Sequence, residues 1–415
     1  MAKKERIELD KKDWSARFTL IGEADITDFT FKMDQTSEKS DWVWNQMNLR
    51  VDCGERHGRV DCELMNGFGS ERDNVIYVHG KTEDGKDDFK NSYTIAWEDR
   101  FDEDILADIG DLSFISVGLE TTEDDEIFFT RFLTGYDAIA YIKEHLEPGM
   151  VIKVNGQLRY STYNDTIQCK KEINSIYLAI DKKTKKPVTP ENYSATFVQT
   201  MLLDEESCTK ASLDKDASVL YVDAYLLEKF KSYNGWDLTE NGKVRGGKFV
   251  PLNKRFEFVV DLSTDAGKKK VAAVLASDKM FKVKKGTVTQ ITFEGEFVES
   301  GATVQTTVDD LPPDIKELLD IGVITEEEAL AQCSEGGSRE RRMLLVRPHL
   351  KKVGEEDEKT TVINYTPEKY NADDLVFDFL TPKNEEDEED DVEEDIEEVT
   401  EEATSDDSDD WLNAL

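Results

Sequence analysis

Apolar and polar residues alternate in a series of short runs along the first part of the chain. Trp14–Ile21 and Trp42–Cys53 each follow a two-residue period, and the turn Gly54–Gly58 leads from the second run into a third, Arg59–Phe68. This alternation predicts half-buried β-strands, and the glycine-bounded turn predicts that the second and third runs form a hairpin. Residues 70–113 mix short strand signals with Asp-rich loops, which indicates an insertion on the surface of a sheet.

In the next part of the chain, the spacing of apolar residues changes from the two-residue period of a strand to that of a helix and back. Ile127–Leu133 is a predicted strand, Tyr136–His145 is a predicted helix ended by Pro148 and Gly149, and Met150–Tyr160 resumes the two-residue period. A last run, Ile167–Leu178, completes the set. The succession of strands, one short helix, a glycine turn and two more strands is typical of the OB-fold, a small closed five-stranded barrel with one helix between its third and fourth strands that binds oligonucleotides or oligosaccharides.

The second half of the chain repeats this order. After a Lys-rich linker come predicted strands at Thr196–Leu203, Ser218–Leu227, Phe256–Leu262, Val288–Val298 and Met343–Val346, with a helix at Thr264–Ala276. The fourth strand of each half carries a second glycine, Gly156 or Gly295, where a tightly curled barrel strand would bend. Any two β-domains that contain a helix share some of this order, so the internal repeat is a hypothesis.

The predicted fold class is therefore mainly β with minor α: tandem OB-fold-like five-stranded barrels with insertions and a disordered acidic tail. The predicted domains are a first barrel at 1–180 with its insertion at 70–113, a linker at 181–194, a second barrel at 195–352, a linker at 353–383 and a tail at 384–415. The second barrel carries a basic glycine-rich loop within Ser232–Pro251 and a helical insertion at Pro312–Cys333.

The tail is the most biased segment of the chain. Residues 384–415 hold eighteen Asp or Glu and no Lys or Arg, and they end in Trp411-Leu412-Asn413-Ala414-Leu415. Like charges at this density repel one another and few apolar residues are present to bury, so the sequence predicts a disordered arm with an apolar tip. The formal net charge of the chain is -39. Without the tail the body is still acidic, which argues against a generic nucleic-acid binder unless the positive charge is segregated.

The remaining composition indicates a soluble protein of a reducing compartment. The N-terminal residues are charged and show no apolar segment of the secretory type, and no run approaches the length of a membrane span. The cysteines are odd in number and far apart, which fits free thiols better than a disulfide framework; they are Cys53, Cys62, Cys169, Cys208 and Cys333.

Signatures of catalysis and of metal binding are weak. The chain has no phosphate-binding Gly-Lys-Ser/Thr loop, no zincin helix and no Gly-x-Ser-x-Gly elbow, so we expect no enzyme and no cofactor. Cys53, His57 and Cys62, with His79 as a fourth ligand, suggest zinc, but their spacing fits no common structural zinc pattern. We expect no metal.

Basic and aromatic residues gather in a few loops, as single-stranded nucleic acid requires. Lys243–Arg255 contains five basic residues and no acidic one, close to Trp236, and Arg159–Tyr163 forms the hairpin turn where an OB-fold binds its ligand. Taken singly, the Trp residues could be barrel core and the Lys residues solvated. The predicted nucleic-acid contacts are Trp42, Trp44, Arg50, Arg159, Tyr160, Tyr163, Lys170, Lys171, Tyr233, Trp236, Lys243, Arg245, Lys248, Lys254, Arg255, Arg341 and Arg342.

With these features the chain resembles the single-stranded DNA-binding proteins of bacteria and their phages, in which an OB body precedes an acidic tail with an apolar end. Asp406–Leu415 matches that layout, although the terminal Pro-Phe of the bacterial family is missing and two barrels are predicted instead of one. The resemblance implies a cytoplasmic protein of a bacterial cell or phage-infected host that coats single-stranded DNA during replication, repair or recombination. It also implies that replication and recombination enzymes bind the tail through Asp409, Asp410, Trp411, Leu412 and Leu415.

Two further expectations concern the tail and the alternative function. A tethered polyanion would occupy the basic groove when DNA is absent, so deleting 384–415 would tighten DNA binding. The alternative is an acidic interaction protein, either a DNA mimic or an assembly scaffold for basic partners, which explains the negative body more simply and the basic loop less well. The sequence does not determine the oligomeric state.

Overall fold

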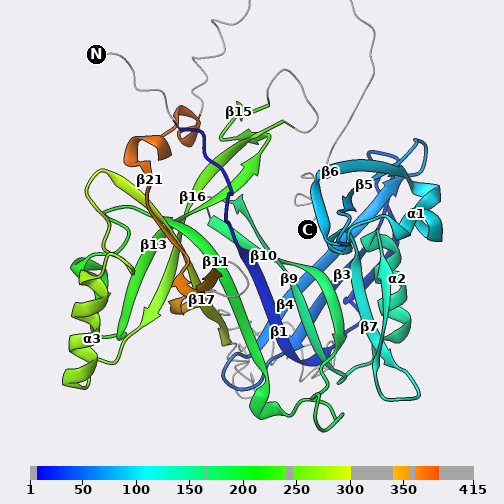
Figure 1. Cartoon of the computed structure of the whole chain (residues 1–415), viewed down its shortest axis with the longest axis horizontal. Coiled ribbons are helices and arrows are strands. Elements are labelled where there is room, and N and C mark those ends of the chain that lie inside the picture. The colour runs from blue at the N-terminus through cyan, green and yellow to red at the C-terminus, as the bar shows by residue number, and fades with distance from the viewer. Residues whose placement is uncertain (1–6, 165, 240–245, 301–339, 355–359, 383–415) are drawn as a thin grey trace, which may run out of the picture.

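The structure is a computed structural model that describes residues 7–164, 166–239, 246–300, 340–354 and 360–382. The predicted helical insertion at Pro312–Cys333, the basic residues Lys243 and Arg245, Cys333 and the predicted tail lie outside these residues. Two groups of strands lie side by side in Figure 1, the first half of the chain mainly on the right and the second half on the left.

The first group closes into a five-stranded barrel. Its strands pair in the order β1-β3-β4-β10-β9 and back to β1, with β4 and β10 parallel and the other pairs antiparallel. Helix α2 (Gly135–His145) stands between the third and fourth barrel strands in the sequence, as the OB connectivity requires. The strands are β1 (Ala16–Asp25), β3 (Trp42–Asp52), β4 (Arg59–Gly69), β9 (Val151–Tyr163) and β10 (Thr166–Leu178).

The second group closes in the same order. Its ring is β11-β13-β16-β18-β17, with β16 and β18 parallel, and helix α3 (Asp265–Ala276) again stands between the third and fourth strands. The predicted mainly β class with OB-like barrels is therefore confirmed. The strands are β11 (Ser194–Leu203), β13 (Val219–Phe230), β16 (Lys248–Val259), β17 (Thr287–Ser300) and β18 (Glu340–Pro348).

The two predicted bending glycines lie at crowded points of the barrels. A Cβ on Gly156 would stand 1.9 Å from the carbonyl oxygen of Glu172, and one on Gly295 would stand 2.1 Å from the ring of Phe197. The strand register shifts beside both positions, between Ile173 and Ser175 on β10 and between Glu294 and Gly295 on β17. Only glycine allows the backbone to approach this closely.

The barrels are joined by a shared seam of strands. Residues Ala16–Ile21 of β1 pair with β9 on one edge and with Ser194–Gln199 of β11 on the other. The His57 backbone oxygen accepts a hydrogen bond of 2.9 Å from the Glu299 N–H, and the Arg56 guanidinium lies 2.6 Å from the Glu296 carboxylate. The two barrels therefore form one body with one main hydrophobic core.

The insertion in the first barrel is longer than residues 70–113. Beyond that range the chain adds β7 and β8, and β7 pairs in parallel with β10. The predicted strand Ile127–Leu133 is therefore β8, an edge strand outside the closed ring. The insertion has its own small core around Val78, Ile95, Ile109 and Phe114. Its elements are β5 (Val75–Lys81), β6 (Asp87–Ala96), α1 (Glu103–Ala107), β7 (Ile115–Thr121) and β8 (Ile127–Phe132).

Residues 353–383, expected to be a linker, contain regular structure over the part that is described. β20 (Thr360–Ile363) pairs with β19 (Leu350–Val353), and β21 (Tyr365–Asn371) pairs with β17. Tyr370 and Leu375 pack with Leu9 in a satellite core, which the polar composition of the segment concealed. Two short 3-10 helices, Ala372–Leu375 and Asp378–Leu380, follow.

The smaller elements complete the description. They are the strands β2 (Phe31–Thr36), β12 (Leu213–Asp214), β14 (Ser232–Tyr233) and β15 (Trp236–Asp237), and the 3-10 helices Trp97–Phe101, Asp111–Ser113, Pro190–Asn192 and Lys210–Ser212. Within the described residues, no helix has both the length and the apolar character needed to cross a bilayer.

Candidate nucleic-acid interface

An open hollow of about 590 Å³ lies against the outer face of the first barrel. Its floor comes from β3, β4 and β10, and its rims come from the loop that follows β1 and from the β9–β10 hairpin. These are the second and third OB strands with the first and last connecting loops, the region where OB-folds bind oligonucleotides and oligosaccharides. The residues that the argument uses are Phe29, Arg50, Tyr163, Lys170 and Arg341, together with the acidic Asp61 and Glu63.

Strand periodicity explains which side chains reach the hollow. On β3, Met47, Leu49 and Val51 are buried in the barrel, so Asn48 and Arg50 point outward from the same strand. Arg50 lies cross-strand from Asp61 of β4, with its Nε 3.0 Å from the carboxylate. This hydrogen bond raises the pKa of Arg50, so the guanidinium stays charged.

Two exposed aromatic side chains stand on the rims. The Phe29 side chain is 81% exposed and that of Tyr163 is 45% exposed. Phe29 projects from a tight turn in which Thr30 is buried and donates its N–H to the Thr27 carbonyl at 3.0 Å. Asn48 of β3 donates its N–H to the Thr30 carbonyl at 2.8 Å, which fixes this turn to the barrel. Both rings are available as faces for stacking.

The cations of the hollow are held by carboxylates. Arg341 reaches across from β18 of the second barrel and lies 3.1 Å from Asp61, and Lys170 lies 3.7 Å from Glu63. Exposed pairs of this kind contribute only about 0–1 kcal/mol, so exchange for a phosphate partner costs little. The hollow therefore holds three exchangeable cations, Arg50, Lys170 and Arg341, between two aromatic rims.

Lys171 also lines the hollow, but it has a structural role. Its Nζ lies 3.1 Å from the Glu299 carboxylate and 4.7 Å from the centre of the Phe297 ring, and both charged side chains are buried. The pair joins β10 of the first barrel to β17 of the second. Exchanging it for a phosphate contact would leave Glu299 buried without its lysine, which is strongly unfavourable.

The other predicted contacts of the first barrel lie elsewhere. Tyr160 is 5% exposed and donates its hydroxyl to Gln199 at 3.0 Å, so it belongs to the core and its assignment as a contact is a correction. Trp42 and Trp44 are half-buried at the far end of β3, roughly 20 Å along the strand from Arg50. Arg159 is exposed on β9, 3.3 Å from Glu172, and is not among the residues that line the hollow.

The predicted aromatic contacts of the second barrel hold the chain itself. Tyr233 and Trp236 pack against the main core, and the Trp236 Nε1 donates a hydrogen bond of 2.9 Å to the Thr381 carbonyl. Between them Asn234 donates to the carbonyls of Phe379 and Leu380 at 3.3 and 3.0 Å. The β14–β15 hairpin thus binds the last described segment of the chain.

The basic residues of the second barrel are dispersed. Arg255 makes two hydrogen bonds to Asp223, at 2.8 and 3.0 Å, and Arg342 pairs with Glu257. Lys254 lies cross-strand from the buried Ala224 and is half-buried, and this burial lowers the pKa of its ammonium group. Lys248 is exposed at the start of β16. Among the predicted basic contacts of this barrel that the structure describes, Arg341 is the one that reaches the hollow.

The residues considered for zinc do not converge. His57 is buried with its Nδ1 2.9 Å from the Phe297 carbonyl, whereas His79 lies in the insertion. Burial raises the pKa of the Cys53 thiol to about 12 and raises that of Cys62 as well, as expected for inert buried thiols. Over the ranges that the structure describes, no three His, Cys, Asp or Glu side chains gather as a metal site would require.

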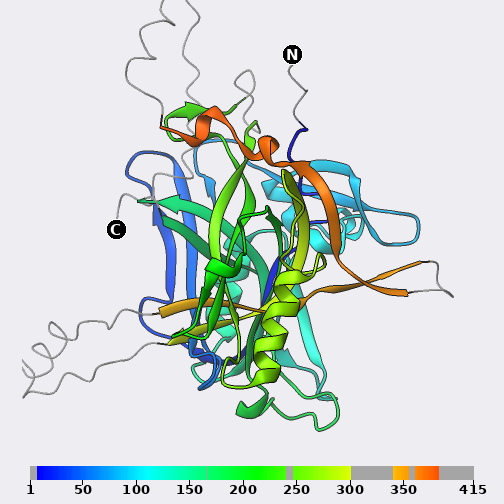
Figure 2. The same ribbon diagram turned by 90° about the vertical axis from the view of Figure 1, so that its left-hand side faces the viewer.

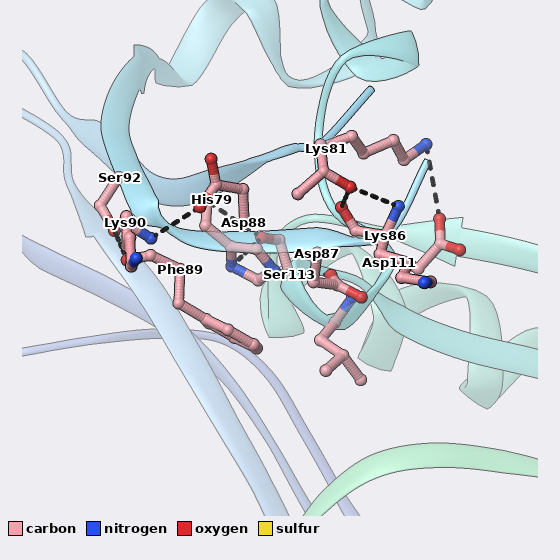
Figure 3. Close-up of polar contacts among 12 residues, drawn as sticks. His79, Lys81, Lys86, Asp87, Asp88, Phe89, Lys90, Ser92, Asp111 and Ser113 are labelled. Carbon is pink, nitrogen blue, oxygen red and sulfur yellow. Dashed lines mark hydrogen bonds and ion pairs between the residues drawn. The ribbon is translucent and has the colours of Figure 1, made fainter. Parts of the chain in front are cut away.

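The insertion contains a serine–histidine–aspartate network that the sequence did not reveal (Figure 3). The Ser113 Oγ lies 2.9 Å from the His79 Nδ1, and the His79 Nε2 lies 2.6 Å from the Asp87 carboxylate. The same Ser113 oxygen also accepts the His79 backbone N–H at 3.2 Å, and Asp87 accepts the Leu112 N–H at 2.8 Å. A neighbouring hollow of about 520 Å³ is lined by other residues. We interpret the network as structural: it joins β5 to β6 and both strands to the 3-10 helix Asp111–Ser113.

Two features of the surface escaped the sequence analysis. Phe29 stands alone in a polar loop, and only its place in the first connecting loop of an OB barrel could have drawn attention to it. The lysines in and after α3 have one aromatic residue among them, the buried Phe281, so they lack the basic-aromatic pattern of a nucleic-acid contact.

Comparisons with known proteins give no relative. No family model matches the chain, and no curated protein matches its sequence. The predicted tail residues Asp409, Asp410, Trp411, Leu412 and Leu415 lie outside the described residues. The OB connectivity and the hollow of the first barrel are therefore the basis of a functional assignment.

Proposed function

We propose that this protein binds single-stranded DNA in the hollow of the first barrel and is a binding protein without catalytic activity. The observation that carries the proposal is the arrangement of Phe29 and Tyr163 on opposite loops, with Arg50, Lys170 and Arg341 between them. Single-stranded nucleic acid is bound by this combination of stacking faces and a cationic track.

The energetics of the hollow favour stacking as the main source of affinity. Each base stacked on an aromatic ring contributes about 1–3 kcal/mol. The cations are already paired with carboxylates, so phosphates gain mainly through release of counterions. Three exchangeable cations would give a slope of roughly -2 in log affinity against log salt, at about -0.7 per phosphate for a single strand. Such a protein binds DNA firmly only where bases are unpaired and free to stack.

The cellular role follows from the resemblance noted above and is part of the proposal. Coating single strands during replication, repair or recombination, in the cytoplasm of a bacterial or phage-infected cell, is consistent with a binding body and an acidic tail. Replication and recombination enzymes are the proposed partners of the tip, Trp411–Leu415.

The test is a fluorescence anisotropy titration of the full chain with a labelled oligonucleotide of about thirty bases, given site sizes of roughly 4–16 nucleotides per OB barrel. We expect saturable binding at low salt that Phe29→Ala and Tyr163→Ala weaken. Phe89→Ala is the matched control, because Phe89 lies on the insertion and its exposure of 66% falls between those of Phe29 and Tyr163. Equal losses in all three variants would contradict the hollow as the binding site.

The acidic interaction protein is the alternative. The specific observation in its favour is that the carboxylates Asp61 and Glu63 stand within the hollow and hold its cations. Absence of oligonucleotide binding at low salt, together with capture of a basic partner, would favour this alternative.

A further inference from the structure

Positive charge is concentrated on and after α3. Residues 265–285 contain seven lysines and two aspartates, in a chain whose net charge is -39. All seven lysine side chains are exposed. We call this surface the lysine face; it consists of Lys268, Lys269, Lys270, Lys279, Lys282, Lys284 and Lys285.

The helix buries two valines and leaves its three lysines exposed. Val271 and Val274 are the buried residues of α3, and Phe281 is buried in the core after the helix ends. Thr264 caps the helix by accepting the Gly267 N–H at 3.1 Å. In Figure 2 the helix, in yellow-green, lies on the outside of the second barrel, on the side that faces the viewer. The lysines therefore surround an exposed element and do not line the hollow of the first barrel.

Few of these charges are neutralised within the body. Lys268 lies 3.9 Å from Asp265 on its own helix, and Lys284 lies 2.9 Å from Glu368 of β21. Lys269, Lys279, Lys282 and Lys285 form no ion pair with any carboxylate of the described residues. Like charges on one segment repel one another, so an anionic partner would lower the energy of this surface.

Other clusters of cations in the molecule differ in this respect. In the hollow, Arg50, Lys170 and Arg341 each lie beside a carboxylate. The Lys-rich turn at 182–186 faces the acidic turn at 123–126, and Lys185 pairs with Glu126. A flexible polyanion therefore gains most at the lysine face, where it displaces no carboxylate.

We propose that the lysine face is the docking surface of the chain's own acidic C-terminal segment, residues 384–415. This segment carries eighteen acidic residues and no basic one. The inference does not depend on DNA binding, and it places the tail on the second barrel, away from the hollow where the sequence analysis expected it.

The chain path supports an intramolecular contact. Glu368 already brings a carboxylate of the C-terminal part to Lys284, and Trp236 fixes the chain at Thr381, just before the segment begins. The 33 residues 383–415 allow a reach of at most about 110 Å, and an unstructured chain of that length spans roughly 30 Å on average. A body of this size has a radius of gyration of about 21 Å. The segment can therefore reach the lysine face at an effective concentration of about a millimolar.

The test is zero-length cross-linking of the full chain with a carbodiimide, which joins a lysine amine to a carboxylate held in contact with it. Peptides are identified by mass spectrometry after mixing isotope-labelled and unlabelled protein, so that links within one chain are separated from links between chains. We expect links from Lys269, Lys279, Lys282 and Lys285 to acidic residues of 385–410, within one chain. They should be lost at about 1 M salt, where the Debye length is near 3 Å.

Variants make the result specific. Combined Lys269→Glu, Lys282→Glu and Lys285→Glu should reduce tail cross-linking by about tenfold, because attraction becomes repulsion. The control is combined Lys182→Glu, Lys183→Glu and Lys186→Glu, which changes the charge of the chain equally at the other Lys-rich turn and should leave the links to α3 in place. These substitutions lie on exposed side chains, so folding can be verified by an unchanged melting curve.

Three outcomes would overturn the proposal. Tail links distributed over all exposed lysines would show no docking surface, and links that occur only between chains would make the tail of a second copy the occupant. The third is protection of the α3 lysines from acetylation by an oligonucleotide in a tail-deleted chain, without any protection by the tail in the full chain. That result would make the surface a nucleic-acid contact. DNA binding in the hollow can fail or hold independently of all three results.

Discussion

The two barrels share one strand order but use their surfaces differently. The first barrel exposes Phe29 and Tyr163 on the loops around its hollow, which also holds cations paired with the carboxylates of Asp61 and Glu63. The second barrel turns Tyr233 and Trp236 inward, where they contact the core and the segment that ends at Thr381. The same connectivity thus supports a ligand face in one copy and an intramolecular contact in the other.

The first barrel therefore supplies the proposed ligand-binding surface, and the second barrel mainly stabilises it. The second barrel sends one arginine, Arg341, into the hollow and braces the first barrel through the buried Lys171–Glu299 pair. Its own outer strands carry Arg255 and Arg342 in ion pairs with Asp223 and Glu257. We therefore expect ligand affinity to depend on the first barrel and stability to depend on both.

The largest expected effect concerns the brace between the barrels. Lys171→Met should destabilise the protein by about 3–5 kcal/mol, because Glu299 would remain buried without its lysine. Combining it with Glu299→Met should recover most of that loss, since two apolar side chains of similar volume need no pairing. The measurement is the free energy of unfolding in urea. An equally unstable double variant would contradict the role of the pair.

A smaller loss is expected on the ligand face. Phe29→Ala or Tyr163→Ala should weaken binding of single-stranded DNA by about 1–3 kcal/mol each, the contribution of one stacked base. Stability should change little, because both side chains are exposed. Anisotropy titrations at fixed salt measure the first quantity and thermal melting the second. Unchanged affinity in both variants would contradict the assignment of the ligand-binding surface to the first barrel.

Breaking the contact between Trp236 and Thr381 should lower stability and leave DNA affinity unchanged. Trp236→Phe removes the hydrogen bond to Thr381 and should cost about 0.5–1.5 kcal/mol. Cleavage of the segment around Thr381 by a protease should become faster while DNA affinity stays constant. A loss of DNA affinity instead would indicate that Trp236 stacks bases, as the sequence suggested.

The sequence predicted the positions of strands better than it predicted which side chains line the binding surface. Alternation located nine of the ten barrel strands closely, but it predicted a loop over Lys248–Arg255, which is the first part of β16. The crowded Gly156 and Gly295 were recognisable from their places in the fourth strands. The same alternation could have placed Tyr160 inside, because it shares a face with the buried Val154 and Leu158. Pairing of β1 with β11 and the packing of 365–375 depend on contacts distant in sequence, which no local pattern encodes.

The smallest effect is on the salt dependence of binding. Arg341→Gln should reduce the slope of log affinity against log salt by about 0.7, the value for one phosphate contact on a single strand. Arg342→Gln is the control, because the neighbouring Arg342 pairs with Glu257 away from the hollow. Titrations at four or more salt concentrations measure both slopes. Equal slopes in the two variants would exclude Arg341 from phosphate contact.

The most direct test of the central claim is oligonucleotide protection of the first barrel in the intact protein. Hydrogen exchange of the full chain is measured at low salt with and without an oligonucleotide of about thirty bases. We predict slower exchange in the loop around Phe29 and in the β9–β10 hairpin around Tyr163, with no change in the β14–β15 hairpin. Protection of the β14–β15 hairpin alone, or no protection anywhere, would contradict the assignment of the hollow as the DNA-binding site.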